Sequence, residues 1–299
     1  MDPKIFIVVP VYNRLDIVRN YLANIERQTY NNIEVIIVDD NSSDGTPERI
    51  RKEYDSLRLK IIETEGDEWW GGSVRIGIDY VTEHAKDDDC ILLMNDDVNF
   101  DPDLCKKFVN AHKDKQNAVL SGIEIVEGEV KPTGTKMICW PLAITRRPYA
   151  GHEWPSEDLP DSFEVDFLGA RASFYPISIV KDIGNIASDK LPHYHADGEY
   201  SYRAVRNGYN VYVITDIPIY SNPETTGLFN SWTNEYTWEQ LLPSFFEFKS
   251  INNIKHRWEF AKLCSPKIWL YPYFISHVSK AFIRSVFMIL KSKITFFKK

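Results

Sequence analysis

Two apolar runs near the amino terminus leave this chain few folds to adopt. Ile5–Val9 and Val35–Val38 contain only branched aliphatic side chains and one phenylalanine, so neither run has a polar face. A strand of this kind must be covered on both sides, as inner strands of parallel sheets are. Residues 16–25, between the two runs, carry apolar side chains at helical spacing. This order predicts an α/β fold with a doubly wound, mostly parallel sheet and right-handed crossovers.

The alternation of strand and helix continues along the chain. Residues 131–164 are rich in Gly, Pro and Trp and indicate hairpins or irregular structure, whereas residues 222–235 indicate a polar loop or linker. Further strands are expected at Leu59–Ile62, Ile91–Met94, Val119–Ile123 and Tyr209–Ile214, and further helices at Val74–Ala85 and between His195 and Gly208.

Charge is distributed unevenly along the chain. The net charge of -8 excludes general binding to nucleic acids, because phosphate contacts need clustered Lys and Arg. From Lys249 onward there are eleven Lys or Arg and one acid, Glu259, so this part carries +10 and the first 248 residues carry -18. The two parts are therefore expected to do different things.

The cysteines and the amino terminus bear on the compartment. Cys90, Cys105, Cys139 and Cys264 are too widely spaced to indicate a zinc site or a disulfide framework, so a reducing compartment is expected. The amino terminus lacks the pattern of a secretory signal. No uncharged apolar run reaches the roughly 18 residues of a membrane-spanning helix. These observations predict a cytoplasmic protein without a clear membrane span.

Two adjacent carboxylates follow the predicted strand at Ile91–Met94. Asp96 and Asp97 would lie at the carboxyl end of that strand, the edge where open α/β sheets bind ligands. Neighbouring like charges are stable in solvent or with a cation between them. One or two carboxylates together with substrate phosphates are a usual arrangement for Mg²⁺. A solvated Asp-Asp turn is the alternative interpretation.

Four motifs in register resemble those of the family 2 glycosyltransferases, which are inverting enzymes of GT-A fold. The resemblance covers roughly residues 4–220. A further stretch, Trp69–Ser73 with Arg75, is similar to the donor pocket of rhamnosyltransferases that build surface polysaccharides. The four motifs are Val8-Val9-Pro10-Val11-Tyr12-Asn13, Val38-Asp39-Asp40-Asn41-Ser42-Ser43-Asp44-Gly45-Thr46, Asn95-Asp96-Asp97 and Ala196-Asp197-Gly198-Glu199.

The resemblance implies a division of the chain and a donor site. Residues 1–225 would form the catalytic domain, with a nucleotide-sugar half at about 1–100 and an acceptor half at about 101–225, and residues 226–299 a basic helical extension. Asp97 would bind Mg²⁺ or Mn²⁺, which would neutralise the departing diphosphate. The donor contacts implied are Pro10, Tyr12, Asp40, Trp70, Gly72, Arg75, Asn95 and Asp96.

Several of these donor residues have a second interpretation. By resemblance Asp40 accepts a hydrogen bond from a pyrimidine ring, which selects a UDP- or dTDP-sugar. The alternative is a turn or capping acid, which explains Asp39 as well as a functional role does but is less favoured for Asp40 because the motifs are in register. Arg75 could meet the diphosphate or be a surface arginine. The chain also departs from the family pattern: Asn95 replaces an acid, and Tyr220–Pro223 stands where many members place a metal-binding histidine.

Asp197 matches the catalytic base of the family. Inversion needs one base to take the proton of the attacking hydroxyl. The alternative is a helix N-cap, and the two roles are compatible because a helix amino terminus keeps a carboxylate ionised. Glu199 and Arg203 form an ordinary i,i+4 pair, and His193 and His195 read as exposed and incidental.

Candidate acceptor contacts are Trp140, His195 and Glu199. Pyranose rings bind aromatic faces, so Trp69, Trp70, Trp140, Tyr149 and Trp154 could form a sugar-binding cluster, although core packing explains them too.

The basic tail has the pattern of a helix on a membrane surface. His277, Lys280, Arg284 and Lys291 follow one face, and a second face is apolar. Peripheral contact with the cytoplasmic membrane would bring the cleft to a lipid-linked acceptor. A bundle helix or a partner interface is the alternative. The apolar face comprises Phe274, Val278, Phe282, Val286 and Ile289.

Together these features predict an inverting, metal-dependent glycosyltransferase that elongates a surface polysaccharide or another glycoconjugate. A nucleotidyltransferase acting on sugar phosphates would leave Asp197 without a role. Asn95 and the absent histidine leave room for a catalytically silent sugar-binding or scaffold protein.

Overall fold

The computed structural model describes residues 2–221 and 237–296. The strands are β1 Ile5–Val11, β2 Ile33–Asp39, β3 Leu59–Glu63, β4 Cys90–Met94, β5 Val98–Phe100, β6 Ala118–Val126, β7 Glu129–Val130, β8 Gly134–Cys139, β9 Ile144–Arg146, β10 Ser162–Glu164, β11 Phe167–Leu168, β12 Ala172–Pro176 and β13 Asn210–Ser221. The helices are α1 Leu15–Glu26, α2 Thr46–Glu53, α3 Trp69–His84, α4 Leu104–Asp114, α5 Ile177–Ile183, α6 Ala196–Arg206, α7 Trp238–Leu241, α8 Ile254–Cys264 and α9 Leu270–Phe296, with 3₁₀ turns η1 Pro243–Phe245 and η2 Lys267–Trp269.

One large sheet organises the chain in the order β10-β13-β6-β12-β4-β1-β2-β3. Strands β4, β1, β2 and β3 are parallel to one another, and β6 is parallel to β13. Strand β12 runs antiparallel between β4 and β6 and joins these two groups. The prediction of a mostly parallel sheet is confirmed. The sequence pattern did not indicate the antiparallel strand β12 inside the sheet, and the short strands β5, β7 and β10 also pair antiparallel with their neighbours.

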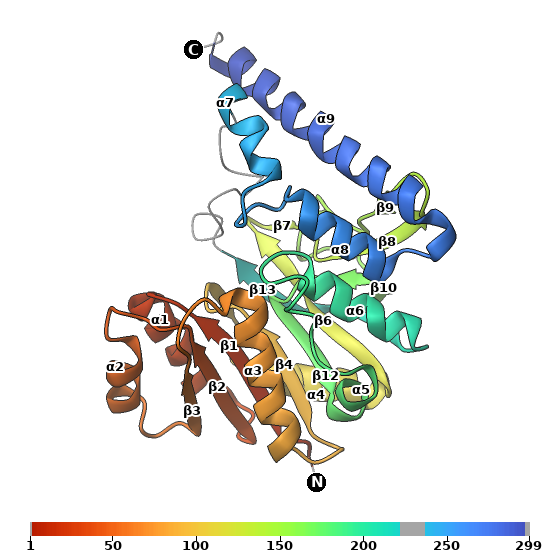
Figure 1. Cartoon of the computed structure of the whole chain (residues 1–299). Coiled ribbons are helices and arrows are strands. Elements are labelled where there is room, and N and C mark those ends of the chain that lie inside the picture. Colours follow the sequence, from red (N-terminus) through yellow and green to blue (C-terminus); the bar gives the residue numbers. More distant parts are fainter. Residues whose placement is uncertain (1, 222–236, 297–299) are drawn as a thin grey trace.

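Helices cover both faces of this sheet, as the apolar strands require (Figure 1). Ile5, Ile7 and Val9 of β1 pack with α1, α2 and α4 on one face. Phe6 and Val8 of the same strand pack with α3, α5 and α6 on the other. The period of two along a strand thus places alternate residues in separate cores, and the prediction of a doubly wound fold is confirmed.

Two element boundaries differ from the predicted ones. Helix α3 begins at Trp69 rather than Val74, because the backbone at Gly71 packs closely on the loop at Pro192, to which the Gly71 N–H donates. Tertiary packing therefore overrides the low helix propensity of the two glycines. Strand β13 continues to Ser221 through a shift in register between Ile214 and Pro218. The predicted loop at residues 222–235 lies outside the described residues.

A smaller antiparallel sheet, β11-β8-β9, and the helices α8 and α9 lie beyond the carboxyl ends of the main strands (Figure 1). Ser276 and Lys280 of α9 donate hydrogen bonds of 2.9 Å to the carbonyl oxygens of Pro141 and Ala143, in the turn between β8 and β9. These contacts fix α9 along the margin of the molecule.

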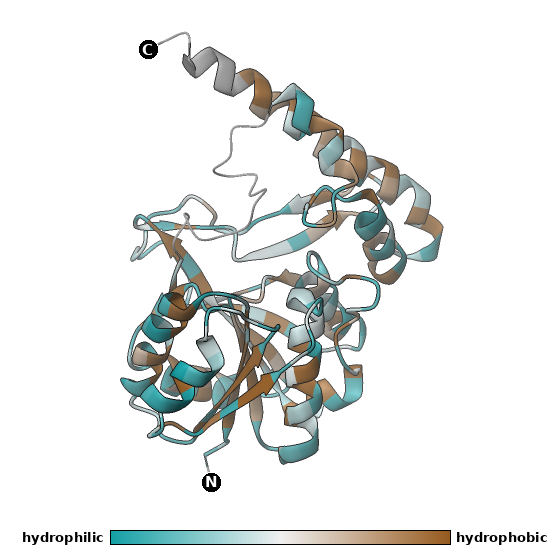
Figure 2. Ribbon diagram, turned by 60° about the vertical axis from the view of Figure 1, so that its left-hand side comes forward, coloured by the Kyte–Doolittle hydropathy of each residue, from teal (hydrophilic) through white to brown (hydrophobic). Residues whose placement is uncertain are grey.

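The faces of α9 differ from the predicted ones. Val278, Val286 and Ile289, which were expected to contact lipid, pack instead against α7 and η1, and Phe274 packs against the main core. Phe282, the fifth residue of the predicted face, is 41% exposed, and its ring centroid lies 6.2 Å from that of Phe245. A different set of residues forms an exposed apolar stripe along the helix, and Figure 2 shows hydrophobic residues over its length. The apolar stripe consists of Tyr271, Ile275, Ile283, Phe287 and Leu290.

One described helix, Lys267–Leu290, is long and apolar enough by length and composition to cross a membrane. The search for an uncharged run missed it because Lys280 and Arg284 interrupt the apolar residues.

Candidate functional site: a carboxylate corner and a cavity at one sheet edge

The first part of the site is a corner at the carboxyl end of β4, formed by Asn95, Asp96 and Asp97. Both acidic side chains are almost wholly buried, at 2% and 5% exposure for Asp96 and Asp97. Arg14, which precedes α1, donates a 2.6 Å hydrogen bond to Oδ1 of Asp96, and its Nη2 lies 3.6 Å from Oδ2 of Asp97. Sequence reasoning missed Arg14, whose only signal was its place in the polar turn after β1.

The electrostatics of this corner fit a divalent cation. Burial raises the pKa of Asp96 to about 7, with Asp97 raising it further and Arg14 opposing the shift. Oδ2 of Asp96 is buried and accepts no hydrogen bond. An all-oxygen donor set with one carboxylate oxygen unused suits Mg²⁺ or Mn²⁺ completed by water and phosphate oxygens. Within the described residues no group of three His, Cys, Asp or Glu side chains comes together, so such an ion would depend on its substrate for ligands.

Helix α3 closes one side of the corner. Trp70 Nε1 donates a 3.0 Å hydrogen bond to Oδ1 of Asn95. This bond joins the start of α3 to the turn after β4, two segments whose motifs each predicted a contact with the donor. The N–H of Gly71 donates at 2.7 Å to Pro192, in the loop before α6. A Cβ on Gly71 would lie 2.8 Å from that carbonyl oxygen, so only glycine allows this approach. The start of α3 therefore links the corner to the loop that leads to Asp197.

Asp40 organises the entry to α3. Its carboxylate accepts hydrogen bonds from Thr64 Oγ1 at 2.8 Å and from the backbone N–H groups of Glu68 and Trp69 at 3.1 and 3.0 Å. Asp40 therefore acts as a turn acid, and its carboxylate keeps further lone pairs that could accept hydrogen bonds from a ligand. Asp39 is a buried turn acid that accepts from the N–H of Ser42, and burial raises its pKa.

The turn after β1 lies beside the turn after β2. Asn13, at a φ of 51°, accepts from the N–H of Ser43 and donates its own N–H to Ser42. Tyr12 is 55% exposed at this rim, and Pro10 is half-buried within β1. Both occupy the edge where donor contacts were expected.

Two predicted donor residues lie on α3. Arg75 is on its exposed face, where its side chain lies 3.9 Å from Asp79, as the surface-arginine interpretation expects, and its contact with the diphosphate stays a prediction. Gly72 is buried against the side chain of Glu68, where it permits close packing of the first turn of α3. Arg14 is the arginine that reaches the carboxylates.

Asp197 lies in the first turn of α6, not at its N-cap. The N-cap is His195, at a φ of 72°, and its side chain makes no capping bond. The Asp197 carboxylate accepts from the N–H of Gly198 at 2.8 Å and of Ala170 at 3.3 Å. Burial raises the pKa of Asp197 and outweighs the N–H donors at the start of the helix, which were expected to keep this carboxylate ionised. A buried carboxylate with a raised pKa is a stronger base once ionised.

A short chain of contacts connects Asp197 to the carboxylate corner. Ala172, at the start of β12, pairs with Met94, which directly precedes Asn95. Ala170, two residues earlier, donates its N–H to Asp197. With the bond between Gly71 and Pro192, this gives two independent links, so both acidic positions lie at the same edge of the sheet.

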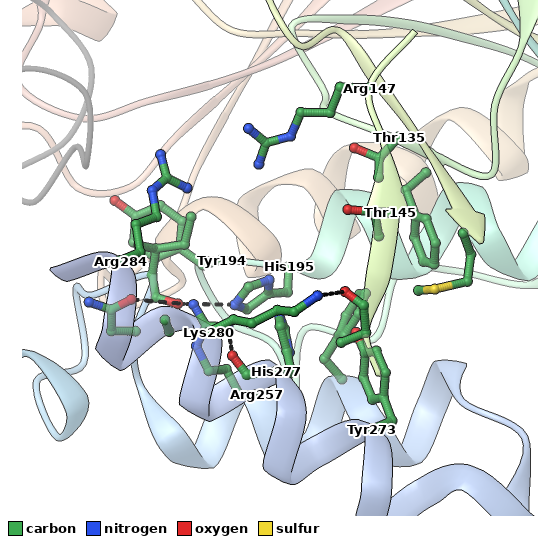
Figure 3. Close-up of a pocket in the computed structure, with 18 of the residues that line it drawn as sticks. Thr135, Thr145, Arg147, Tyr194, His195, Arg257, Tyr273, His277, Lys280 and Arg284 are labelled. Carbon is green, nitrogen blue, oxygen red and sulfur yellow. Dashed lines mark hydrogen bonds between the residues drawn. The ribbon is translucent and has the colours of Figure 1, made fainter. Parts of the chain in front are cut away.

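Asp197 also lines a cavity of about 430 Å³ between the small sheet, α6, α8 and α9 (Figure 3). Phe167, Phe260 and Tyr273 contribute aromatic walls. Among the described residues that line it, none comes from the Asn95–Asp97 corner. The cavity therefore extends from Asp197 away from the corner, as an acceptor site would.

Of the predicted acceptor contacts, His195 lines the cavity, whereas Glu199 and Trp140 do not. His195 is not an exposed side chain: its ring packs against Phe260 and His277, and burial lowers its pKa to about 3. Burial likewise lowers the pKa of His193 to about 4. Both rings are therefore neutral at pH 7.

Glu199 does not reach an acceptor. Its carboxylate is 3% exposed and is bound by the guanidinium of Arg203, which also donates to the carbonyl oxygens of Ile183 and Asn185. This pair ties α6 to the end of α5, so the i,i+4 interpretation is confirmed and the acceptor contact is wrong.

The predicted aromatic cluster is dispersed. Trp140 packs against Phe167, Tyr202 and Tyr273 behind the cavity wall and does not line the cavity. The remaining aromatics make separate contacts: Trp69 with Phe248 and His193, Tyr149 with Phe163, and Trp154 with Tyr220. Core packing explains these side chains better than one sugar platform does.

The chain is similar to known glycosyltransferases over part of its length. The AmsB amylovoran biosynthesis glycosyltransferase of Erwinia amylovora is 31% identical over 131 residues, which are 43% of this chain and 38% of AmsB. The GalNAc(5)-diNAcBac-PP-undecaprenol beta-1,3-glucosyltransferase of Campylobacter jejuni is 33% identical over 61 residues, 20% of each chain. The matched stretches thus span well under half the length of these relatives.

The fold has counterparts among solved structures. The mannosyltransferase PcManGT of Pyrobaculum calidifontis, in complex with GDP-Man and Mn²⁺, superposes with a TM-score of 0.59 at 14% identity, covering 98% of this chain and 76% of that one. The family model for glycosyl transferase family 2 matches residues 6–164, more than half of the chain. This chain is a member of glycosyl transferase family 2.

Proposed function

We propose that the protein transfers a sugar from a UDP- or dTDP-sugar to a hydroxyl of a glycan acceptor, with inversion at the anomeric carbon, in the synthesis of a surface polysaccharide. The observation that carries this proposal is the pair of links joining Asp197 to the Asn95–Asp97 corner. A base and a leaving-group site at one edge are what a single displacement at carbon requires.

The proposed reaction is a direct displacement. Asp197, ionised, accepts the proton of the acceptor hydroxyl as its oxygen bonds to the anomeric carbon. The bond from that carbon to the diphosphate oxygen breaks, and the nucleoside diphosphate leaves with the electron pair toward the corner. Asp97 and Asp96 would hold Mg²⁺ or Mn²⁺ there, and the ion would offset charge on the leaving diphosphate. Trp70 keeps Asn95 in place, and Arg14 holds the two carboxylates.

Donor choice rests on Asp40 and the rim around it. The resemblance of the Asp39-Asp40 motif supports a pyrimidine nucleotide, and the spare lone pairs of Asp40 would accept from the ring. The structural neighbour PcManGT was solved with GDP-Man and Mn²⁺. A purine donor is therefore the competing outcome, and Mn²⁺ is the first ion to test.

The acceptor is proposed to be lipid-linked, at the cytoplasmic face of the membrane. The name of the Campylobacter jejuni relative includes an undecaprenyl diphosphate acceptor. The exposed apolar stripe of α9 supports peripheral contact with lipid, beside the cavity that Asp197 lines. In this proposal residues 1–225 bind donor and acceptor sugar, and residues 226–299 complete the acceptor side.

The test is a sugar-nucleotide panel of UDP-, dTDP- and GDP-sugars, assayed for release of nucleotide with Mn²⁺ and with a chelator. Turnover of a UDP- or dTDP-sugar that the chelator abolishes supports the proposal. Release of pyrophosphate from a nucleoside triphosphate and a sugar phosphate would indicate a nucleotidyltransferase instead. Binding of a sugar nucleotide without any turnover would indicate a silent binding protein. Transfer that survives both Asp97→Ala and Asp197→Asn refutes the site.

A further inference from the structure

The carboxylate corner contains a cation supplied by the protein itself. The guanidinium of Arg14 donates a hydrogen bond of 2.6 Å to Oδ1 of Asp96, and its other amino nitrogen lies 3.6 Å from Oδ2 of Asp97. The side chain of Arg14 is 29% exposed, whereas those of the two acids are 2% and 5% exposed. One guanidinium therefore spans two neighbouring carboxylates, in surroundings where charges interact more strongly than in water.

The backbone on both sides of Arg14 is fixed by the turn after β2. Asn13, which precedes it, accepts a 2.7 Å hydrogen bond from the N–H of Ser43. Leu15, which follows it, donates its N–H to the Asp44 carboxylate at 3.1 Å. The turn after β2, part of the rim where the donor is proposed to bind, therefore determines where this guanidinium lies.

A divalent cation at the corner would meet the charge of Arg14. An ion bound to Asp97 would lie a few ångströms from the guanidinium, and like charges at that distance repel each other. The positive charge of Arg14 also offsets part of the negative charge that attracts the ion. Oδ2 of Asp96 is buried and accepts no hydrogen bond from any described residue, so an ion can bind this oxygen while Arg14 keeps its short bond to Oδ1.

We propose that Arg14 makes the binding of Mg²⁺ or Mn²⁺ at the corner depend on the nucleotide: its charge weakens binding of the ion alone, and the donor diphosphate offsets that charge when both bind. The inference rests on the proposed function and adds a coupling between the two ligands of that site. Guanidinium groups pair with phosphate oxygens, so the side chain that repels the ion attracts the diphosphate.

Coupling of this kind is reciprocal. If the nucleotide raises the affinity for the ion by some factor, the ion raises the affinity for the nucleotide by the same factor. Removal of the Arg14 charge should reduce that factor from both directions. A purely structural role, in which Arg14 only holds the two carboxylates in place, predicts the opposite for the ion: its loss would weaken binding of Mn²⁺.

The experiment first measures binding of Mn²⁺ alone to the full chain at pH 8, from the electron paramagnetic resonance signal of the free ion. We expect Arg14→Gln to bind Mn²⁺ at least about tenfold more tightly than the unaltered chain. Calorimetric titration with UDP, with and without Mn²⁺, then gives the coupling factor, which should fall at least about fivefold in Arg14→Gln.

The matched control is Arg27→Gln. Arg27 follows the last residue of α1, at the opposite end of that helix from Arg14, and its side chain is exposed. The variant loses the same charge, but solvent and salt screen that charge from the corner. Both the Mn²⁺ affinity and the coupling factor should change less than about twofold.

Two readouts guard against a loss of folding. Arg14→Gln leaves two buried carboxylates side by side, so Mn²⁺ should raise its melting temperature more than that of the unaltered chain. Arg14→Lys keeps the charge but cannot pair with both carboxylates at once, so its Mn²⁺ affinity should lie between the other two. Mn²⁺ binding by Arg14→Gln that is no tighter than that of the unaltered chain would overturn the inference. If Arg14→Gln does not fold even with Mn²⁺, the same result for Arg14→Lys overturns it.

Failure of this inference and failure of the proposed function give different results. The measurement with Mn²⁺ alone needs no donor and no turnover. Turnover of a sugar nucleotide by a chain whose Mn²⁺ affinity does not respond to Arg14→Gln sinks only the coupling. Tighter Mn²⁺ binding by Arg14→Gln, in a chain that turns over no sugar nucleotide, sinks only the enzyme.

Discussion

At the scale of single residues, Asp197 is the side chain whose removal is most informative, because nothing else that lines the cavity among the described residues is acidic. Asp197→Asn keeps the size and the hydrogen-bonding shape but cannot accept the proton. We expect kcat for transfer to fall by about 10²- to 10⁴-fold. Affinity for the nucleotide, measured by calorimetry, should stay unchanged. A variant with more than a tenth of normal kcat would contradict the assignment.

The pH profile of transfer follows from the same carboxylate. Burial raises the pKa of Asp197 above the usual aspartate value. The reaction uses the ionised form, so kcat/KM should decline as pH falls through the raised pKa, and the acidic limb should lie above the usual aspartate value. Rates measured between pH 4 and pH 9 check this. An acidic limb at or below the usual aspartate value would show that the base is another group.

Sequence reasoning placed the acidic side chains better than it placed their partners. The family resemblance singled out Asp97 and Asp197, and local order accounts for their positions after β4 and at the start of α6, at one edge of the sheet. Arg14 was missed because which arginine reaches a carboxylate depends on tertiary packing. Glu199 was misassigned for the same reason: only the fold shows that Arg203 buries it.

At the scale of elements, the packing of the first turn of α3 depends on the absence of a Cβ atom at Gly71. A Cβ on Gly71 would meet the backbone carbonyl oxygens of Pro192 and Leu191 at 2.8 and 2.9 Å. Gly71→Ala should lower the free energy of unfolding by about 1–3 kcal/mol, because backbone cannot move aside as a side chain can. It should also lower transfer, since the same contact links the corner to the Asp197 loop.

Gly72→Ala is the matched control for this prediction. Its added Cβ would meet mainly the flexible side chain of Glu68, which can rotate away. The helix propensity gained by alanine, about 1 kcal/mol, offsets part of the crowding. Chemical denaturation of both variants measures their free energies of unfolding. An equal decrease in the two variants would show that the contact of Gly71 with the backbone at Pro192 does not limit the substitution.

The apolar stripe on α9 predicts binding to lipid vesicles. Ile283→Ser with Phe287→Ser removes two exposed apolar side chains, each worth about 1.5 kcal/mol or more when buried. Binding to vesicles that contain anionic lipid should weaken at least tenfold, as measured by co-sedimentation. Ile138→Ser, an exposed apolar residue on β8, is the control. Unchanged binding of the double variant would place the membrane contact elsewhere.

Elements whose sequence has one clear hydrophobic pattern were predicted well, whereas the buried and exposed faces of α9 were not. Buried strands such as β1 have a single arrangement, because every side chain is apolar and both faces must be covered. An amphipathic helix with apolar residues on more than one side allows two rotations. The packing of Val286 and Ile289 on α7 and η1, which lie far along the chain from the main sheet, selects between them.

At the scale of the whole molecule, the carboxyl-terminal helices are part of the folded body. Phe260 of α8 packs against Phe167 and His195, and Tyr273 of α9 is buried. A chain that ends at residue 236 should therefore lose soluble yield or melt well below the full chain, because these apolar surfaces become exposed. A chain that ends at residue 290 keeps the contacts and should melt normally. Equal melting of all three would support an independent domain at 1–225.

Among the described residues that line the cavity none precedes Thr135, whereas Arg14, Asp40, Trp70 and the Asn95–Asp97 corner all precede Asn99. Under the proposed function, the residues that select the donor and those that select the acceptor lie in consecutive, non-overlapping portions of the chain. A recombination event within α4 or β6 would exchange one specificity and keep the other. New linkages could arise between strains by a single crossover, without passing through an inactive intermediate.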